Sequence, residues 1–299
     1  MLKDIAIIFM SIFFESFPFL LLGALISSII ETFVSNDTMA KIIPKNKVLG
    51  SIVGICLGFF LPACDCAVIP VAKRLIKKKV PINVAVSFML ASPIINPVVI
   101  LSTYHAFYKT NPDIFWLRLV LGIIVSLVIG IILGILFGKK EVITNNEDES
   151  CCSHCHEQDC ECEEHKHKNV FLSIINHTAL DLFEVVKYLM FGALIASIIQ
   201  VVLPRDILIM FNNNRILSII ALMLFAYLVS LCSTSDSFVG KSLLSSFSKS
   251  SIMAYLLLGP MIDIKNTIVL FGNYKKSFVL SLISLIFISI FIVSMVIVL

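Results

Sequence analysis

The sequence has 299 residues, of which 58% are hydrophobic and only 14% are charged. A soluble chain usually carries about 25% charged residues, so the composition excludes an ordinary soluble enzyme or binding domain and indicates an integral membrane protein. The formal net charge is +3, and no basic patch with interleaved aromatic residues occurs, which argues against a nucleic-acid partner.

Apolar stretches long enough to cross the bilayer as helices, about 20 residues each, follow one another along the chain. They predict an all-α integral membrane protein with about eight transmembrane helices, at residues 5–34, 48–72, 82–104, 114–138, 171–203, 215–240, 251–271 and 277–298. We interpret the first stretch as a retained span, because no small-residue cleavage site follows its apolar core. Prolines inside the second, third and seventh stretches predict broken helices near the midplane, where protein or water satisfies the freed backbone groups.

Charge and composition divide the chain into three parts. The segment at 139–169 holds nine of the 20 acidic residues, and it separates a first transmembrane repeat (1–138) from a second (170–299). The segment "KRLIKKK" (73–79) carries five Lys/Arg residues, which the positive-inside rule places in the cytoplasm. We therefore expect a multi-pass protein of the cell membrane whose acidic loop faces the cytosol.

The two halves resemble each other in sequence. "FFESFPFLLLGALISSIIE" (13–31) matches "LFEVVKYLMFGALIASIIQ" (182–200) at an offset of 169. Cys64 falls on Cys232 at an offset of 168, and Asn96 falls on Asp263 at 167. The nearly constant offset predicts an internal repeat. Four spans in each half would make the halves parallel, whereas one re-entrant segment in each half would make them inverted.

Cysteines and carboxylates gather at one depth in the predicted spans. Cys64 lies nine residues before Lys73, about 13 Å along a helix, which places it near the midplane. An aspartate there costs about 2.5–3.5 kcal/mol unless it meets a cavity or a partner. Thiolates prefer soft metals and metalloids. The candidate substrate-binding residues are Cys64, Asp65, Cys66, Ser92, Asn96, Cys232, Asp236 and Asp263.

A plainer interpretation exists for these side chains, since cysteine packs well as a small apolar residue and serine joins helices by hydrogen bonds. The central loop carries a second motif, "CCSHCHEQDCECEEHKHK" (151–168), whose composition indicates metal binding although its spacings fit no single zinc-finger pattern. The alternative is a solvated acidic linker. The candidate ligands of a soft metal ion there are Cys151, Cys152, His154, Cys155, His156, Cys160, Cys162, His165 and His167.

Two blocks of sequence resemble a known family. "LPACDCAVIPVAKRLIKKKVPINVAVSFMLASPIINPVVILST" (61–103) and "CSTSDSFVGKSL" (232–243) with "GPMIDIKN" (259–266) are similar to the signature blocks of ArsP-type predicted permeases. That family includes efflux permeases for trivalent organoarsenicals, so the resemblance implies eight spans and arsenic-binding thiols at Cys64, Cys66 and Cys232. Arsenical exporters have a small residue between the two cysteines, where this chain has Asp65.

The sequence therefore favours a permease, not an enzyme, that exports a thiophilic metal or metalloid species such as a trivalent methylated arsenical, driven by protons through Asp65, Asp236 or Asp263. Zinc or another transition metal is an alternative cargo. The residues also allow a permease for an unrelated organic solute, or a membrane thiol oxidoreductase that uses Cys64 and Cys66 as its redox pair. For the assembly, we expect a homodimer.

Overall fold

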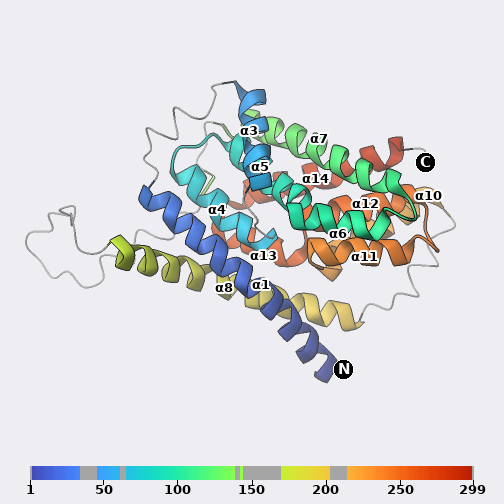
Figure 1. Ribbon diagram of the computed structural model, residues 1–299, viewed down its shortest axis with the longest axis horizontal. Coiled ribbons are helices and arrows are strands. Elements are labelled where there is room, and N and C mark those ends of the chain that lie inside the picture. The colour runs from blue at the N-terminus through green and yellow to red at the C-terminus, as the bar shows by residue number, and fades with distance from the viewer. Residues whose placement is uncertain are drawn as a thin grey trace, which may run out of the picture.

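The computed structural model describes residues 2–33, 46–60, 65–138, 142–143, 170–202 and 214–297, and nearly all of them are helical (Figure 1). The helices of the first half are α1 (Leu2–Phe33), α3 (Lys47–Phe60), α4 (Asp65–Lys77), α5 (Ile82–Ile95), α6 (Pro97–Phe107) and α7 (Pro112–Leu136). Those of the second half are α8 (Val170–Val202), α10 (Arg215–Val229), α11 (Ser233–Leu243), α12 (Lys249–Met261), α13 (Ile264–Asn273) and α14 (Lys276–Val296). The predicted all-α membrane fold is confirmed at this level.

Five helical segments are long and apolar enough to cross a membrane. They lie within α1, α7, α8 and α14 and in the α12–α13 pair, and the α5–α6 pair, bent by 40°, would make a sixth. α3 and α10 have only 14 and 15 residues, which is too short for a core about 30 Å thick. The expected count of eight spans is therefore not confirmed among the described residues.

α3 and α4 form a hairpin that begins and ends on one side. Lys47, at the start of α3, accepts a hydrogen bond of 2.8 Å at its carbonyl oxygen from Asn83 Nδ2, at the start of α5. Farther along, Gly58 of α3 lies against Ser92 of α5, so these helices run parallel. The end of α4 leads into α5 through residues 78–81. Both ends of the α3–α4 pair thus lie where α5 begins.

α10 and α11 make the same kind of turn in the second half. The Oγ atoms of Ser218 on α10 and Ser251 on α12 are 2.9 Å apart, so the two helices start together. α11 ends at Leu243 and leads into α12 through residues 244–248. A stretch that is long and apolar enough to cross can therefore still turn back, and hydropathy alone does not distinguish these two paths.

The remaining breaks have local chemical causes. Pro97 opens α6, and the Asn96 side chain accepts a 3.0 Å hydrogen bond from Val98 N there. Asp263 caps α13 by accepting a 2.6 Å hydrogen bond from Asn266 N. These contacts satisfy backbone donors that a helix start leaves unpaired inside the bilayer.

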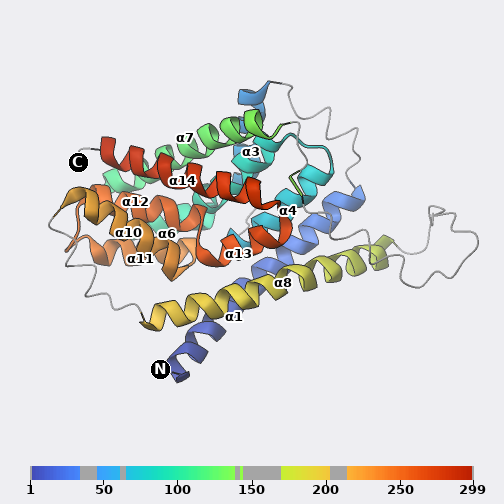
Figure 2. The same cartoon turned by 180° about the vertical axis from the view of Figure 1, so that it is seen from behind.

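The helices are arranged as a packed bundle with one crossed pair beside it. α7 lies against α5 and α14, and small residues of α7 allow this close approach, since a Cβ added at Gly134 would lie 2.6 Å from Asn83 Cβ. α1 and α8 cross each other along one edge of the bundle in both views and contact α4 and α13 (Figures 1 and 2). α1 and α8 thereby cover the first turns of α4 and α13.

Candidate functional site

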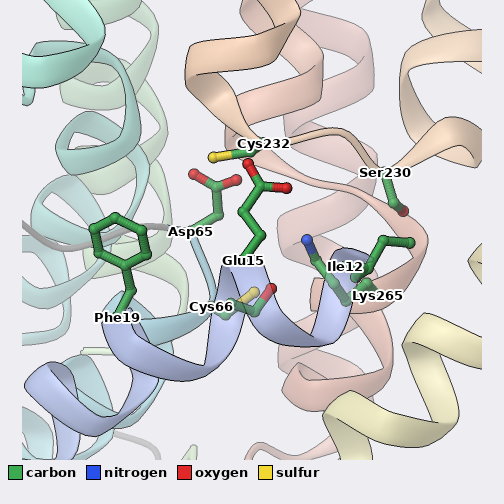
Figure 3. Close-up of a pocket in the computed structure, with 9 residues that line it drawn as sticks. Ile12, Glu15, Phe19, Asp65, Cys66, Ser230, Cys232 and Lys265 are labelled. Atoms are coloured by element: carbon green, nitrogen blue, oxygen red, sulfur yellow. The ribbon is translucent and has the colours of Figure 1, made fainter. Parts of the chain in front are cut away.

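A cavity of about 20 Å³ lies where the starts of α4, α11 and α13 meet α1 (Figure 3). This volume accommodates a water molecule or a small ion. Its walls come from both halves of the chain. The lining residues are Ile12, Glu15, Ser16, Phe19, Asp65, Cys66, Ser230, Cys232 and Lys265.

Asp65 is the buried carboxylate of this pocket. It is the first residue of α4 and is 5% exposed, and its Oδ1 accepts a hydrogen bond from Ser233 Oγ, the first residue of α11. Helix starts carry partial positive charge and unpaired N–H groups, and the starts of α4 and α11 meet at this carboxylate. The cost of an aspartate within a span predicts a polar partner for Asp65, and Ser233 is such a partner.

Two of the three predicted thiols line the pocket. Cys66 follows Asp65 and is 2% exposed, whereas Cys232 precedes α11 and is partly exposed. Figure 3 shows the Cys232 sulfur beside the Asp65 carboxylate. Thr234 Oγ1 donates to Cys232 Sγ at 3.4 Å. One thiol from each half thus reaches the same cavity, and Cys64 lies outside the described residues.

Lys265 is a pocket residue that the sequence reasoning missed. It is the second residue of α13 and 3% exposed, and its Nζ lies 3.5 Å from Asp263 Oδ2. The signal was present, because an ionisable side chain within a predicted span is a functional candidate by default. Glu15 of α1 also faces the pocket and is itself exposed (Figure 3).

Asp236 belongs to a neighbouring polar cluster rather than to the cavity wall. Its Oδ1 accepts a 3.0 Å hydrogen bond from Tyr255 OH. Arg118 of α7, 2% exposed, donates to Ser237 Oγ at 2.6 Å and to the Ser233 carbonyl at 3.4 Å. The first turn of α11 therefore connects this cluster with Asp65.

Ser92 and Asn96 lie at packing positions. Ser92 Oγ donates to the Gly58 carbonyl at 3.5 Å, and Asn96 caps α6. Neither residue lines the cavity described above, and Asp263 reaches it only through Lys265. The structure thus brings Asp65, Cys66 and Cys232 together and leaves the remaining described candidates around them.

Comparison with known proteins explains this combination of membrane helices and polar cavity. Residues 1–299 match the family ArsP_1, described as a predicted permease. The chain belongs to this family of predicted permeases. The resemblance seen in the two signature blocks is thereby confirmed, and the chain is a multi-pass membrane protein of the permease class.

Two relatives cover almost the whole chain. One, from Streptococcus mutans, is named as a two-component membrane permease complex subunit; it is 36% identical over 276 residues, which are 91% of this chain and 88% of the relative. The other, UPF0718 protein YcgR of Bacillus subtilis, is 37% identical over 281 residues, 93% of this chain and 91% of the relative. No solved structure matches.

The second predicted metal site, at residues 151–168, lies outside the described residues. Where the chain is described, no group of three or more His, Cys, Asp or Glu side chains is arranged to hold a metal ion. Asp65, Cys66 and Cys232 are thus neighbours in one cavity without forming a ready metal-ligand shell. A cargo that binds there must draw the two thiols together.

Proposed function

We propose that the chain is a permease that exports a small thiophilic metal or metalloid species from the cytosol, with a trivalent methylated arsenical as the first candidate. The observation that carries the proposal is the cavity lined by Asp65, Cys66 and Cys232 from both halves. Membership of a predicted permease family supports the transport class. Zinc or another transition metal is the alternative cargo, because sulfur and carboxylate ligands also suit Zn²⁺.

The chemistry of capture follows from the two thiols. A methylarsenite molecule carries two hydroxyl groups on arsenic, and each thiol replaces one of them. Each step forms one As–S bond, breaks one As–O bond and releases one water, which takes the thiol proton. Asp65 can relay that proton, because it lies in the same cavity as both sulfurs. The reverse reaction with two waters releases the cargo, as transport requires.

We further propose that the two halves are inverted repeats. Each half has the same order of helices: a long helix, a broken hairpin, a broken span and a second long helix. Each half would then cross the membrane three times and contain one hairpin that does not cross. Because three is an odd number of crossings, the second half has the opposite orientation in the membrane, and the turns of the two hairpins lie near the midplane. The N-terminus then lies opposite the basic segment at 73–79, unlike in a chain with eight crossings.

The positive charges support the inverted arrangement. Fourteen Lys/Arg residues fall on one side, within 41–47, 73–79, 139–168 and 275–276, and six fall on the other side. Eight crossings would distribute the same twenty residues 12 to 8, which is a weaker bias. The side with fourteen is the cytoplasmic side by the positive-inside rule.

Protons are the proposed driving ion. Asp65, Asp236 and Asp263 are all buried among membrane helices, where carboxylates typically mark relays in pumps and transporters. The name of the Streptococcus mutans relative also suggests a second subunit as a partner, which co-purification would reveal. The homodimer expected from sequence stays a prediction.

The test measures uptake into everted membrane vesicles, or efflux from whole cells, of methylarsenite, arsenite, Zn²⁺ or Cd²⁺. Wild type is expected to export at least one of these, and Cys66→Ser and Cys232→Ser are each expected to lose export of the same cargo. The double variant should be no worse than either single one, because the two sulfurs act as a unit. Cys56→Ser, at an exposed position on α3, is the matched control.

Two results would reject the thiol site. One is export by wild type that survives both substitutions, which would indicate an unrelated solute path. The other is a wild type that, although inserted in the membrane, behaves like vesicles without the protein for every soft cargo. A reversible disulfide between Cys64 and Cys66 that turns over with a quinone would instead support the oxidoreductase alternative.

A further inference from the structure

Among the described residues that line the cavity, Lys265 carries the only ammonium, and thiol chemistry does not require it. Its side chain is 3% exposed, and in Figure 3 its nitrogen lies beside the Glu15 side chain, below the Glu15 carboxylate. The ammonium is within electrostatic range of Asp263, Asp65, Cys66 and Cys232. A buried lysine in a transmembrane segment is expensive, so its presence calls for a role.

The ammonium pairs with Asp263 and acts electrostatically on Asp65 across the cavity. Its Nζ lies 3.5 Å from Asp263 Oδ2, which is longer than the roughly 2.7–2.9 Å of a charge-assisted hydrogen bond. Asp263 Oδ2 is buried and has no hydrogen-bond partner within the described part of the chain. Asp263 Oδ1 is already occupied by Asn266 N at 2.6 Å. One oxygen of Asp263 is therefore available for a closer contact with Lys265, while Asp65 competes from across the cavity.

We propose that Lys265 is a tethered cation that holds the place of a cationic cargo in the empty pocket and withdraws onto Asp263 when the cargo binds. This inference rests on the proposed transport function. A soft dication near Asp65 repels the ammonium, and Asp263 Oδ2, now 3.5 Å from Lys265 Nζ, offers it a closer contact. Binding of the ion to the two thiols forms two metal–sulfur bonds, breaks two S–H bonds and releases two protons, one to the Asp65 carboxylate and one to solvent, and both return to the sulfurs when the ion leaves. When the ion leaves, the ammonium returns to the cavity and neutralises Asp65.

The role makes a specific prediction about selectivity. Lys265 competes electrostatically with Cd²⁺ or Zn²⁺, but it competes little with an uncharged trivalent arsenical, which replaces hydroxyl groups without bringing charge. Lys265 therefore biases the pocket toward neutral soft species and speeds the release of dications. A lysine that only braces α13 would affect both kinds of ligand through stability alone.

The first experiment measures binding to the full-length purified protein. Cd²⁺ and phenylarsine oxide are the probes, and wild type is compared with Lys265→Met, with Lys265→Arg and with Lys276→Met, an exposed lysine at the start of α14. Lys265→Met is expected to bind Cd²⁺ about tenfold tighter or more, since a repelling charge has gone. Its affinity for phenylarsine oxide should change less than about threefold, and the arginine and Lys276 variants should resemble wild type.

The second experiment measures transport of Cd²⁺ in proteoliposomes. Lys265→Met is expected to keep cargo–cargo exchange and to lose net efflux, because the empty pocket no longer has its own cation for the return step. Unchanged affinity and unchanged net flux in Lys265→Met would overturn the proposal, and so would equal gains for Cd²⁺ and phenylarsine oxide. If Lys265→Met does not fold, Asp263→Asn with Lys265→Met removes both charges and keeps the α13 cap; a smaller Cd²⁺ gain is then expected, still larger than the gain for phenylarsine oxide, because an attracting carboxylate leaves with the repelling ammonium.

Failure of the proposed function looks different. In that case the wild type does not bind Cd²⁺ or phenylarsine oxide through Cys66 and Cys232. The Lys265 variants also bind neither of the two probes. If the wild type binds both probes and the Lys265 variants show no selective change in affinity, only the tethered-cation role is contradicted.

Discussion

Ser233 donates a hydrogen bond to Asp65, and the two residues, 168 positions apart, are the first residues of α11 and α4. The first turn of α4 thus contacts the first turn of α11, where the two hairpins meet. Each helix start brings partial positive charge to the carboxylate. The contact therefore joins the two halves of the chain at the buried carboxylate of the pocket.

Ser233→Ala should weaken this junction. It leaves a buried carboxylate oxygen without its hydroxyl donor, which typically costs about 1–3 kcal/mol in the free energy of unfolding. Thermal unfolding in detergent should show a lower midpoint, and export should fall with it, whereas Ser233→Thr keeps a hydroxyl and should behave nearly as wild type. Ser242→Ala, on the exposed side of the same helix, is the control. Equal stability of the Ser233 and Ser242 variants would contradict the assignment.

Asp65→Asn should separate stability from coupling. The amide oxygen still accepts from Ser233, so the protein should fold, but it carries no charge and relays no proton. In everted vesicles that contain the wild type, an imposed pH gradient should stimulate uptake of the cargo. In vesicles that contain Asp65→Asn, the same gradient should not stimulate uptake. Asp113→Asn, at the exposed start of α7, should keep it. Gradient-driven uptake that persists in Asp65→Asn would assign coupling to another group.

Arg118 should be coupled to Asp236 in a double-mutant cycle. Arg118→Gln removes hydrogen bonds to α6 and α11 and leaves the buried Asp236 without its nearby cation, a kind of loss that costs about 3–5 kcal/mol. Asp236→Asn in the same chain should recover part of the loss, with a coupling of about 0.5–3 kcal/mol. Arg118→Lys keeps the positive charge but lacks the planar guanidinium, so its free energy of unfolding should lie between those of the wild type and Arg118→Gln. Purely additive unfolding free energies would show that the two side chains act independently.

The sequence predicted the composition of the pocket better than its connections. The offset of 168 singled out Cys64 and Cys232, and the cost of a buried aspartate singled out Asp65 with the cysteines beside it. The cavity is lined by Asp65, Cys66 and Cys232, whereas Cys64 lies outside the described residues. Soft-ligand chemistry does not select Lys265, although the cost of burying an ammonium within a predicted span can be read from the sequence. The contact of Arg118 with α11 spans more than a hundred residues and has no local signal.

The predicted count of eight spans is not confirmed among the described residues, and the uncertainty of such a count has a physical reason. Hydropathy records whether a segment can lie in lipid, not whether it returns to the side it entered. The stretch expected at 48–72 is apolar enough for either path, and only the contact of Lys47 with Asn83 shows that it turns back. The prolines did predict where helices break, as at Pro97, because a missing N–H and a fixed φ act locally.

The location of the N-terminus tests the inverted arrangement. A reporter that is active only outside the cytoplasm, fused before α1, should be active, and the same reporter inserted at residue 145 should be silent. Eight crossings predict silence at both positions, because the N-terminus and the central loop then share a side. Cysteine labelling at Lys109→Cys, in the exposed turn before α7, provides a control for the outer side.

The repeated "GALI" motif should matter through its glycines, which press α1 and α8 onto the broken helices. A Cβ at Gly23 would lie 2.6 Å from Ala67 Cβ, and one at Gly192 would lie 3.1 Å from Lys265 Cα. In open space Gly→Ala stabilises a helix by roughly 0.5–1 kcal/mol, whereas overpacking costs about 1–3 kcal/mol. Gly23→Ala should therefore lower the unfolding midpoint and export, and Gly192→Ala should have a milder effect.

Larger side chains make the prediction sharper. Gly23→Leu and Gly192→Leu should each abolish export, because they push α1 or α8 away from the first turn of α4 or α13 and open the cavity wall. The neighbouring Leu25→Ala and Leu194→Ala change side chains that face outward, with exposed fractions of 41% and 44%, and should leave export intact. Export and thermal unfolding measured on all six variants decide the matter. Stabilisation by both alanine substitutions would mean that the crossed pair does not press on the site.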